Sequence, residues 1–154
     1  MYYRVIWLMG LRDVGKSTVA GIIKEIRPDV IVLDQDVVNL SWGRAELKVL
    51  EAGSMARVAA SLLNQGHPVV IASQMVGRQM RDEVRRFAPS AFILLRRNAI
   101  SLKLARSGSE DDFYFKEGEP FAEIATDDLT PKATAEKVLD IMETLYYDKE
   151  EDDD

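Results

Sequence analysis

A short apolar segment, a glycine-rich turn ending in lysine and a segment of helical period follow one another near the start of this 154-residue chain. The turn reads GLRDVGKST over residues 10–18 and matches the pattern G-x-x-x-x-G-K-[ST]. Glycines let the backbone curl so that successive N–H groups point inward, where the positive end of the following helix adds its field. The pattern therefore predicts a phosphate-binding loop between a strand and a helix.

The residues of this loop have distinct predicted roles. Lys16 can reach the β- and γ-phosphates of ATP, and the hydroxyl of Ser17 can bind Mg²⁺. Asp13 is unusual because it puts a carboxylate in a loop that holds anions, although aspartate tolerates left-handed backbone geometry. Besides Lys16 and Ser17, we expect the nucleotide to contact Gly10, Arg12, Asp13, Val14, Gly15 and Thr18.

The rest of the chain alternates short apolar runs with longer segments of helical period, which is typical of a parallel sheet covered by helices. We expect five strands, each buried on both faces, at residues 5–9, 30–33, 69–72, 91–95 and, from a weaker signal, 121–125. The fold class expected is α/β: a three-layer α/β/α P-loop NTPase of the nucleoside-monophosphate-kinase type with a five-stranded parallel sheet.

Helices are expected in the intervening segments. The first covers residues 16–26 and ends before Pro28, and the second covers 45–64 and ends before Gly66. A third buries Met80, Val84 and Phe87, a fourth covers 99–106, and the last starts at Thr130-Pro131, a good N-cap followed by proline. The inner side of that last helix consists of Val138, Ile141, Met142 and Leu145.

Two segments depart from this pattern. Residues 107–120 read SGSEDDFYFKEGEP and are expected to form a loop, either a lid over the site or an inert surface excursion. Residues 148–154 hold six acids and one base, so we expect a disordered acidic tail after a single domain at 1–147.

The composition limits the possible functions. The chain has no cysteine, which excludes disulfides, thiolate metal sites and cysteine nucleophiles. No apolar run approaches the length of a membrane span, and the start of the chain lacks the layout of a signal peptide, so we expect a cytoplasmic protein. A net charge of −6 without a clear basic surface argues against binding to nucleic acid.

Two acids follow the second expected strand, in Leu33-Asp34-Gln35-Asp36. Ligands of such sheets gather at the carboxyl ends of the strands, which places Asp34 and Asp36 beside the phosphate loop. Either Asp34 or Asp36 can accept the proton of an acceptor hydroxyl, and the other can organise Mg²⁺; Asp34 is a candidate for both roles. The alternative is that these acids only cap the next helix.

Arginines form a second candidate group. Arg78, Arg81 and Arg85 recur at helical spacing, and Arg78 and Arg81, together with Asp36, could bind an anionic acceptor. The alternative is a solvated stripe paired with neighbouring acids. Arg106, at the start of the 107–120 loop, could stack on adenine or reach the γ-phosphate.

The chain resembles the adenylylsulfate kinase family. The resemblance lies in residues 5–11 with the phosphate loop, in Asp34-Gln35-Asp36 where the family has Asp-Gly-Asp, in Arg78 and Arg81, and more weakly in residues 124–129. It implies ATP-dependent phosphorylation of the ribose 3′-hydroxyl of adenylyl sulfate, with Mg²⁺. The chain has Asn39 where the family has an arginine, and Met75-Val76-Gly77 where it has Ser-Pro-Tyr.

Three functional hypotheses follow. The leading one is an ATP-dependent kinase that phosphorylates a hydroxyl of a small anionic acceptor, with adenylyl sulfate as the first candidate. The second is a nucleotide-binding protein without transfer activity, and the third is a kinase of another small molecule, a nucleoside or a modified nucleic-acid base. Homodimer formation is left open.

The carboxylate of Asp13 gives the first testable prediction. Asp13→Gly removes a negative charge from a loop that holds anions, so ATP should bind more tightly to the variant. A calorimetric titration of both proteins with ATP and Mg²⁺ measures the change, and an unchanged or weaker affinity would contradict it.

Overall fold

The computed structural model describes residues 2–10, 15–34, 45–73, 78–96, 121–145 and 147–148. The helix expected at 99–106 and the loop at 107–120 lie outside these ranges. None of the helices in the described ranges is both long and apolar enough to cross a membrane. The elements follow one another as β1 (Tyr2–Tyr3), β2 (Val5–Met9), α1 (Lys16–Ile26), β3 (Ile31–Asp34), α3 (Ala45–Asn64), β4 (Val69–Ala72), α4 (Arg78–Phe87), β5 (Ser90–Arg96), β6 (Phe121–Ala125), α6 (Pro131–Leu145) and β7 (Tyr147–Asp148).

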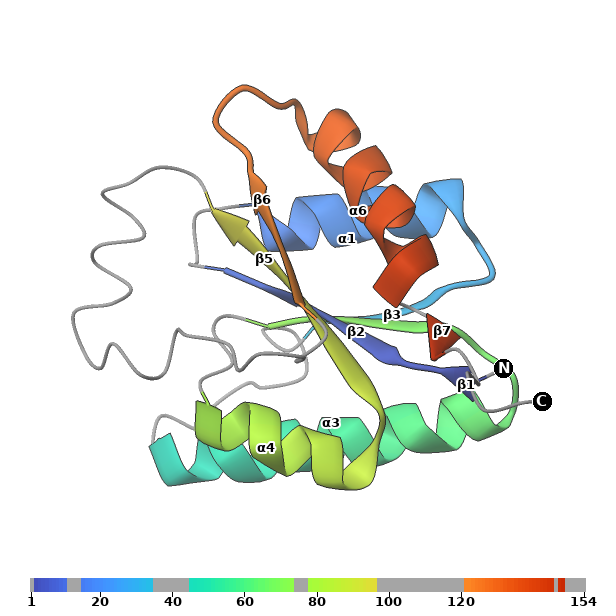
Figure 1. Ribbon diagram of the computed structural model, residues 1–154, viewed down its shortest axis with the longest axis vertical. Helices are drawn as coiled ribbons and strands as arrows, with labels where there is room; N and C mark the ends of the chain where they lie inside the picture. The colour runs from blue at the N-terminus through green and yellow to red at the C-terminus, as the bar shows by residue number, and fades with distance from the viewer. Residues whose placement is uncertain are drawn as a thin grey trace.

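The main sheet has five parallel strands in the order β3-β4-β2-β5-β6. Helices α1 and α6 cover one face, and α3 and α4 cover the other (Figure 1). The predicted three-layer α/β/α fold is confirmed. The chain goes from β2 out to β3, returns to β4 and then crosses to β5, so the strand order reverses beside β2, where ligands of such sheets bind.

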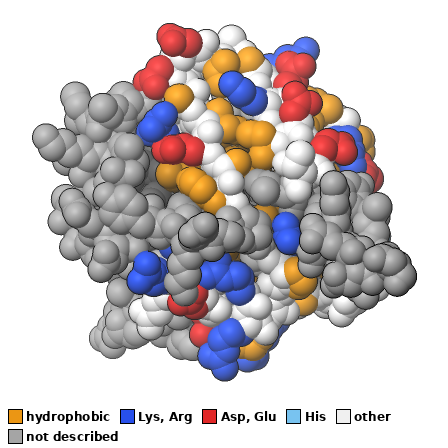
Figure 2. Space-filling view, viewed as in Figure 1, with side chains coloured by type: hydrophobic (Ala, Val, Ile, Leu, Met, Phe, Trp, Pro, Cys, Tyr) orange, Lys and Arg blue, Asp and Glu red, His pale blue; other side chains and the backbone are white. Residues whose placement is uncertain are grey.

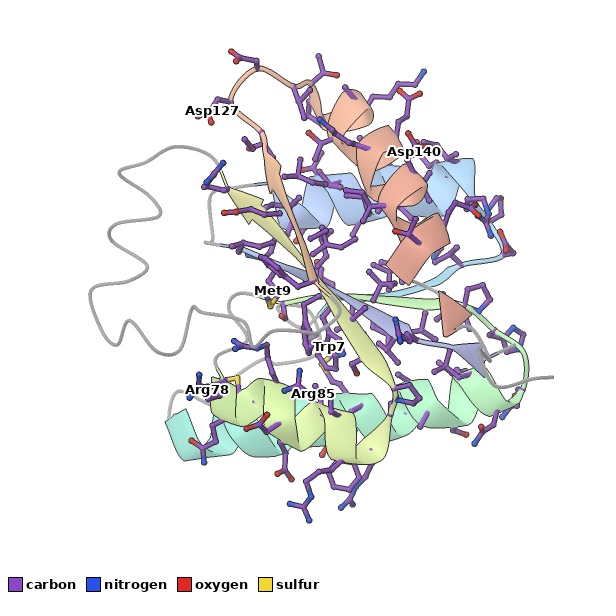
Figure 3. All side chains as sticks on the ribbon, viewed as in Figure 1. Trp7, Met9, Arg78, Arg85, Asp127 and Asp140 are labelled. Atoms are coloured by element: carbon purple, nitrogen blue, oxygen red, sulfur yellow. The ribbon has the colours of Figure 1, made fainter. Side chains whose placement is uncertain are left out.

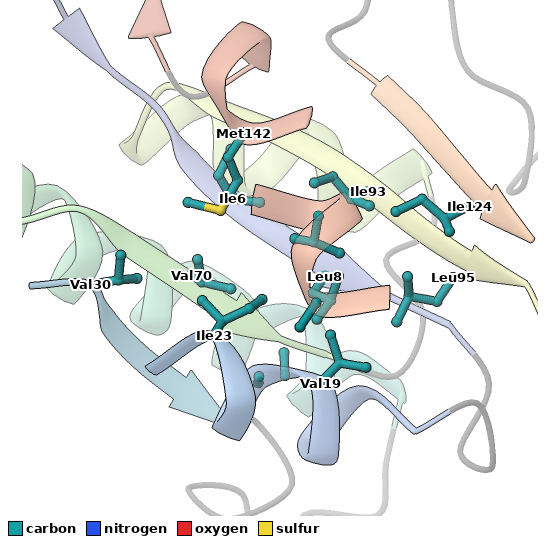
Figure 4. Close-up of a cluster of buried hydrophobic side chains, with 14 of the residues drawn as sticks. Ile6, Leu8, Val19, Ile23, Val30, Val70, Ile93, Leu95, Ile124 and Met142 are labelled. Atoms are coloured by element: carbon teal, nitrogen blue, oxygen red, sulfur yellow. The ribbon is translucent and has the colours of Figure 1, made fainter. Parts of the chain in front are cut away.

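Side chains of the central strand alternate between the two faces of the sheet. Ile6 and Leu8 pack with α1 and α6 (Figure 4), whereas Val5, Trp7 and Met9 pack with α3 and α4. All five are buried, which explains why this strand shows no polar alternation.

The expectation that every strand is buried on both faces is wrong for the two edge strands. All four residues of β3 are only partly buried, and in β6 only Ile124 is buried. An edge strand has a neighbour on one side only, so the helices cover it incompletely.

The helix ends agree with the predictions. Helix α1 ends at Ile26, and Arg27 before Pro28 has left the helical conformation. Helix α3 ends two residues before Gly66, whose φ of 87° favours glycine. Helix α6 is capped by Thr130, whose Oγ1 accepts a hydrogen bond of 3.0 Å from the N–H of Ala133.

The two ends of the described chain pair with each other. Strands β1 and β7 form an antiparallel ladder that aligns Tyr2 with Asp148 and Tyr3 with Tyr147, and they lie side by side in Figure 1. Asp148, the first residue of the expected acidic tail, therefore pairs in this ladder. Residues 149–154 lie outside the described ranges, so the expected tail stays a prediction. Strands of two residues have no detectable period, so the sequence did not predict them.

A buried hydroxyl links the central strand to the turn before β5. The indole Nε1 of Trp7 donates to Ser90 Oγ at 3.0 Å, and Ser90 Oγ donates to the carbonyl of Ala88 at 3.0 Å. Trp7 is fully buried, so no water can replace the hydroxyl as its partner.

We therefore predict that Ser90→Ala lowers the free energy of unfolding by about 1–3 kcal/mol, because the indole N–H loses its partner in the core. Urea unfolding followed by tryptophan fluorescence measures the change. Thr144→Ala is the control, since it removes the exposed hydroxyl that donates to the carbonyl of Ile141 and should cost about 0.5 kcal/mol or less. Equal losses in the two variants would contradict the assigned role.

Candidate nucleotide-binding site

The predicted phosphate loop starts at the end of strand β2, whose five residues are all buried. Strand β2 runs into Gly10, and the chain enters α1 through Gly15, which has φ 89° and ψ 24°. This left-handed conformation costs a residue with a Cβ about 1–2 kcal/mol, which explains the glycine. Residues 11–14 lie outside the described ranges, so the contacts predicted for Arg12, Asp13 and Val14 stay predictions.

Lys16, the first residue of α1, ties the two ends of this loop together. Its Nζ donates to the carbonyl of Gly10 at 2.8 Å, and the residue is only 3% exposed. Burying an ammonium group is costly unless polar partners compensate for the lost water. A neutral carbonyl provides part of that compensation, and the phosphates of a nucleotide would provide a counter-charge as well.

Ser17 and Asp34 meet across the mouth of the loop. The hydroxyl of Ser17, in the first turn of α1, donates to Asp34 Oδ2 at 2.6 Å, at the carboxyl end of β3. Ser17 is exposed and Asp34 half-buried, and hydroxyl and carboxylate oxygens are ligands that Mg²⁺ accepts while it keeps several waters. The pair therefore fits the expected magnesium site. Thr18 is exposed on α1, and Asp36 lies outside the described residues.

Ser73 is a residue at this edge that the sequence analysis missed. It follows β4 directly, and its N–H continues the ladder by donating to the carbonyl of Leu8 at 2.9 Å. The residue is 1% exposed, and its hydroxyl has no hydrogen-bond partner. The sequence marks it only as a polar residue directly after a strand, a position that ordinary turn residues also occupy.

The arginines of α4 do not share one environment. Arg81 is 1% exposed, and Nε of Arg78 is buried without a hydrogen-bond partner. Arg85 instead pairs with Asp82 at 2.7 Å. Helical spacing predicted a common stripe, but only Arg81 is buried in the structure, whereas Arg78 and Arg85 are partly exposed.

Figures 2 and 3 place these arginines in the molecule. Lys and Arg side chains gather over α4 in Figure 2, and Figure 3 places Arg78 at the end of that helix nearer Met9, the last residue of β2. Arg86 lies on the solvent side of the same helix. Its side chain is 71% exposed and pairs with Glu83 at 3.3 Å.

The turn after β6 is fixed to β5. Thr126 donates twice to the carbonyl of Arg96, through its N–H at 2.7 Å and through Oγ1 at 3.2 Å. The side chain of Arg96 pairs with Glu123 of β6 at 3.2 Å. The segment in which the sequence showed its weaker resemblance is therefore anchored at the same edge of the sheet, whereas Arg106 lies outside the described residues.

Comparisons with known proteins show likeness in structure only. No protein-family model and no curated protein sequence matches the chain. A sugar kinase from Janibacter sp. HTCC2649 superposes with a TM-score of 0.70 at 17% identity over 95% of this chain and 99% of its own. The APS kinase of Mycobacterium tuberculosis, solved with AMPPNP and APS, gives 0.70 at 16% identity over 92% and 98%. A gluconokinase from Sinorhizobium meliloti 1021 gives 0.62 at 16% over 94% of each chain.

These likenesses define the class of fold. The chain has the α/β/α fold that solved P-loop kinases have, with a five-stranded parallel sheet. At such low identity they show the fold and leave the activity to be argued from the site.

The left-handed backbone of Gly15 gives a prediction for the loop. Gly15→Ala should lower the free energy of unfolding by about 1–2 kcal/mol, from backbone strain alone, because no atom lies within 4 Å of the added Cβ. Gly21→Ala, inside the same helix and equally open, should instead stabilise by about 0.5–1 kcal/mol. Thermal and urea unfolding of the two variants measure this contrast, and changes of the same sign would contradict it.

Proposed function

We propose that this protein is an ATP-dependent kinase that transfers the γ-phosphate to a hydroxyl group of a small anionic acceptor, with Mg²⁺. The observation that carries the proposal is the enclosed Lys16, held at 2.8 Å from Gly10 at the start of a helix. The Ser17–Asp34 contact of 2.6 Å at the same edge supports it. Together they provide a cation and two metal-binding oxygens where a polyphosphate would lie.

The roles we propose follow from what phosphoryl transfer requires, which is mainly positioning and neutralisation of charge. Backbone N–H groups of the loop and Lys16 would hold the phosphates, and Ser17 and Asp34 would hold Mg²⁺. The metal would neutralise charge on the phosphates. Because Asp34 already accepts the hydroxyl of Ser17, it suits the metal, and Asp36 is left as the candidate proton acceptor.

The acceptor we propose first is adenylyl sulfate, on the resemblance in residues 5–11, 34–36 and 78–81. The superposed APS kinase supports it, and the superposed gluconokinase and sugar kinase keep other small hydroxyl compounds as candidates. A nucleotide-binding protein without transfer activity is the second candidate, because Asp13 puts a carboxylate into the phosphate loop.

Lys16→Ala tests the proposal. Transfer should fall by about 10²–10³-fold, because one donor to the developing charge is lost. The measurement is ADP release in a panel of adenylyl sulfate, gluconate, neutral sugars and nucleosides, with circular dichroism as the check on folding. Lys24→Ala, at an exposed lysine in the last turn of the same helix, is the matched control and should keep full activity.

Two results would contradict the proposal. Undiminished turnover in Lys16→Ala would remove Lys16 from the mechanism. Binding of ATP without ADP release from any acceptor would favour the protein without transfer activity.

A further inference from the structure

The hydroxyl of Ser73 is enclosed at the carboxyl edge of the sheet. Ser73 follows β4 directly and is 1% exposed, and no residue of the described ranges forms a hydrogen bond with its Oγ. Buried polar groups are nearly always paired, because an unpaired one keeps the full cost of losing its water. Neither the Lys16 contact nor the Ser17–Asp34 contact uses this hydroxyl, so its partner is to be sought in a bound ligand.

The strand order places Ser73 between the two contacts of the nucleotide site. Strand β4 lies between β3 and β2, and Ala72 is aligned with Asp34 on one side and with Leu8 on the other. Ser73 is one residue further on, and its N–H donates to the carbonyl of Leu8 at 2.9 Å, which puts it level with the last residue of β2. The Lys16 contact at the end of β2 and the carboxylate contact at the end of β3 therefore flank it.

The group of a nucleotide that would lie between these contacts is the γ-phosphate. In P-loop proteins the lysine reaches the β- and γ-phosphates, and the metal ion bridges oxygens of the same two groups. Here Lys16 is tied to the end of β2, and the proposed metal ligands Ser17 and Asp34 meet at the end of β3. A γ-phosphate held by both would come to the end of β4, the strand between them.

Ser73 would approach this phosphate from the side opposite the metal. Side chains alternate along a strand, so Ser73 lies on the face of Ile71, which α3 and α4 cover, whereas Asp34 lies on the face of α1. A serine hydroxyl can donate to a phosphate oxygen, and hydrogen bonds to a charged group are about twice as strong as neutral ones. The hydroxyl therefore has the chemistry as well as the position to bind an oxygen of the γ-phosphate.

We propose that Ser73 is a residue by which this site distinguishes a nucleoside triphosphate from a diphosphate, through a hydrogen bond from its Oγ to the γ-phosphate. This inference rests on the proposed kinase function and adds a residue to its nucleotide site. A contact made with ATP and not with ADP raises the affinity of the first relative to the second, which favours release of the product after transfer.

The test measures the ratio of two dissociation constants, for ADP and for AMPPNP, by calorimetry with the full chain and Mg²⁺. Ser73→Ala should weaken AMPPNP binding by about tenfold or more, as expected for one lost hydrogen bond to a charged group, and leave ADP binding unchanged. Because the hydroxyl that it removes is unpaired, the variant should not unfold at a lower urea concentration than the wild type.

Two further variants separate the hydrogen bond from packing. Ser73→Cys nearly keeps the size of the side chain, but a thiol is a weak donor, so its ratio should fall between those of the wild type and Ser73→Ala. Ser90→Ala is the matched control, because Ser90 is a buried serine at the amino end of β5, at the opposite edge of the sheet, and its hydroxyl is paired. This control should lower the stability and leave the ratio unchanged.

Three results would overturn the proposal. Unchanged affinity of Ser73→Ala for AMPPNP would confine the hydroxyl to the core, and equal weakening of both nucleotides would remove the discrimination. An equal change of the ratio in Ser90→Ala would reduce the effect to a loss of stability. In these cases both nucleotides still bind to the wild type, so the proposed kinase function stands; if neither binds, both proposals fall.

Discussion

The whole arrangement depends on one constraint: the predicted phosphate loop begins at the end of a strand that is paired on both sides and fully buried. Strand β2 is hydrogen-bonded to β4 on one side and β5 on the other, and both of its faces are buried. Gly10 is therefore held at a fixed place, and Lys16 bonds to its carbonyl at 2.8 Å from the first turn of α1. The ammonium group of Lys16 is thus enclosed at 3% exposure, next to the start of the predicted phosphate loop.

Side chains alternate between the two faces along each strand, so the residues at the carboxyl edge of the sheet fall into two groups, one on each face. On the face of α1 and α6, Ser17 and Asp34 supply oxygen ligands suited to a metal. On the face of α3 and α4, Ser73 and Arg78 each have a buried polar atom without a hydrogen-bond partner. Gly10, where the predicted phosphate loop begins, follows β2, the central strand of the sheet between these two faces. The alternation of side chains along the strands, which has a period of two residues, is enough to place these two pairs of residues on opposite faces of the sheet.

Much of this could be predicted from the sequence, because the features concerned repeat or have a strict pattern. The loop motif gave Gly10, Gly15, Lys16 and Ser17, and the alternation of apolar runs with helical segments gave the layers of the fold. The pairing of β1 with β7 was missed because two residues have no period. Ser73 was missed because a lone serine after a strand looks like any turn residue; only its burial, at 1% exposure, makes it unusual.

Helical spacing alone also could not separate the arginines of α4. Residues three and four apart lie on one side of a helix, but that side is wide enough to reach from the sheet to the solvent. Arg81 is buried on this side of the helix, whereas Arg85 pairs with Asp82 and its guanidinium carbon lies 5.5 Å from the centre of the Phe92 ring.

The fold cannot identify the acceptor, because it is shared by a sugar kinase, a gluconokinase and an APS kinase at 16–17% identity. The choice of acceptor must then come from side chains at the edge of the sheet rather than from the fold itself.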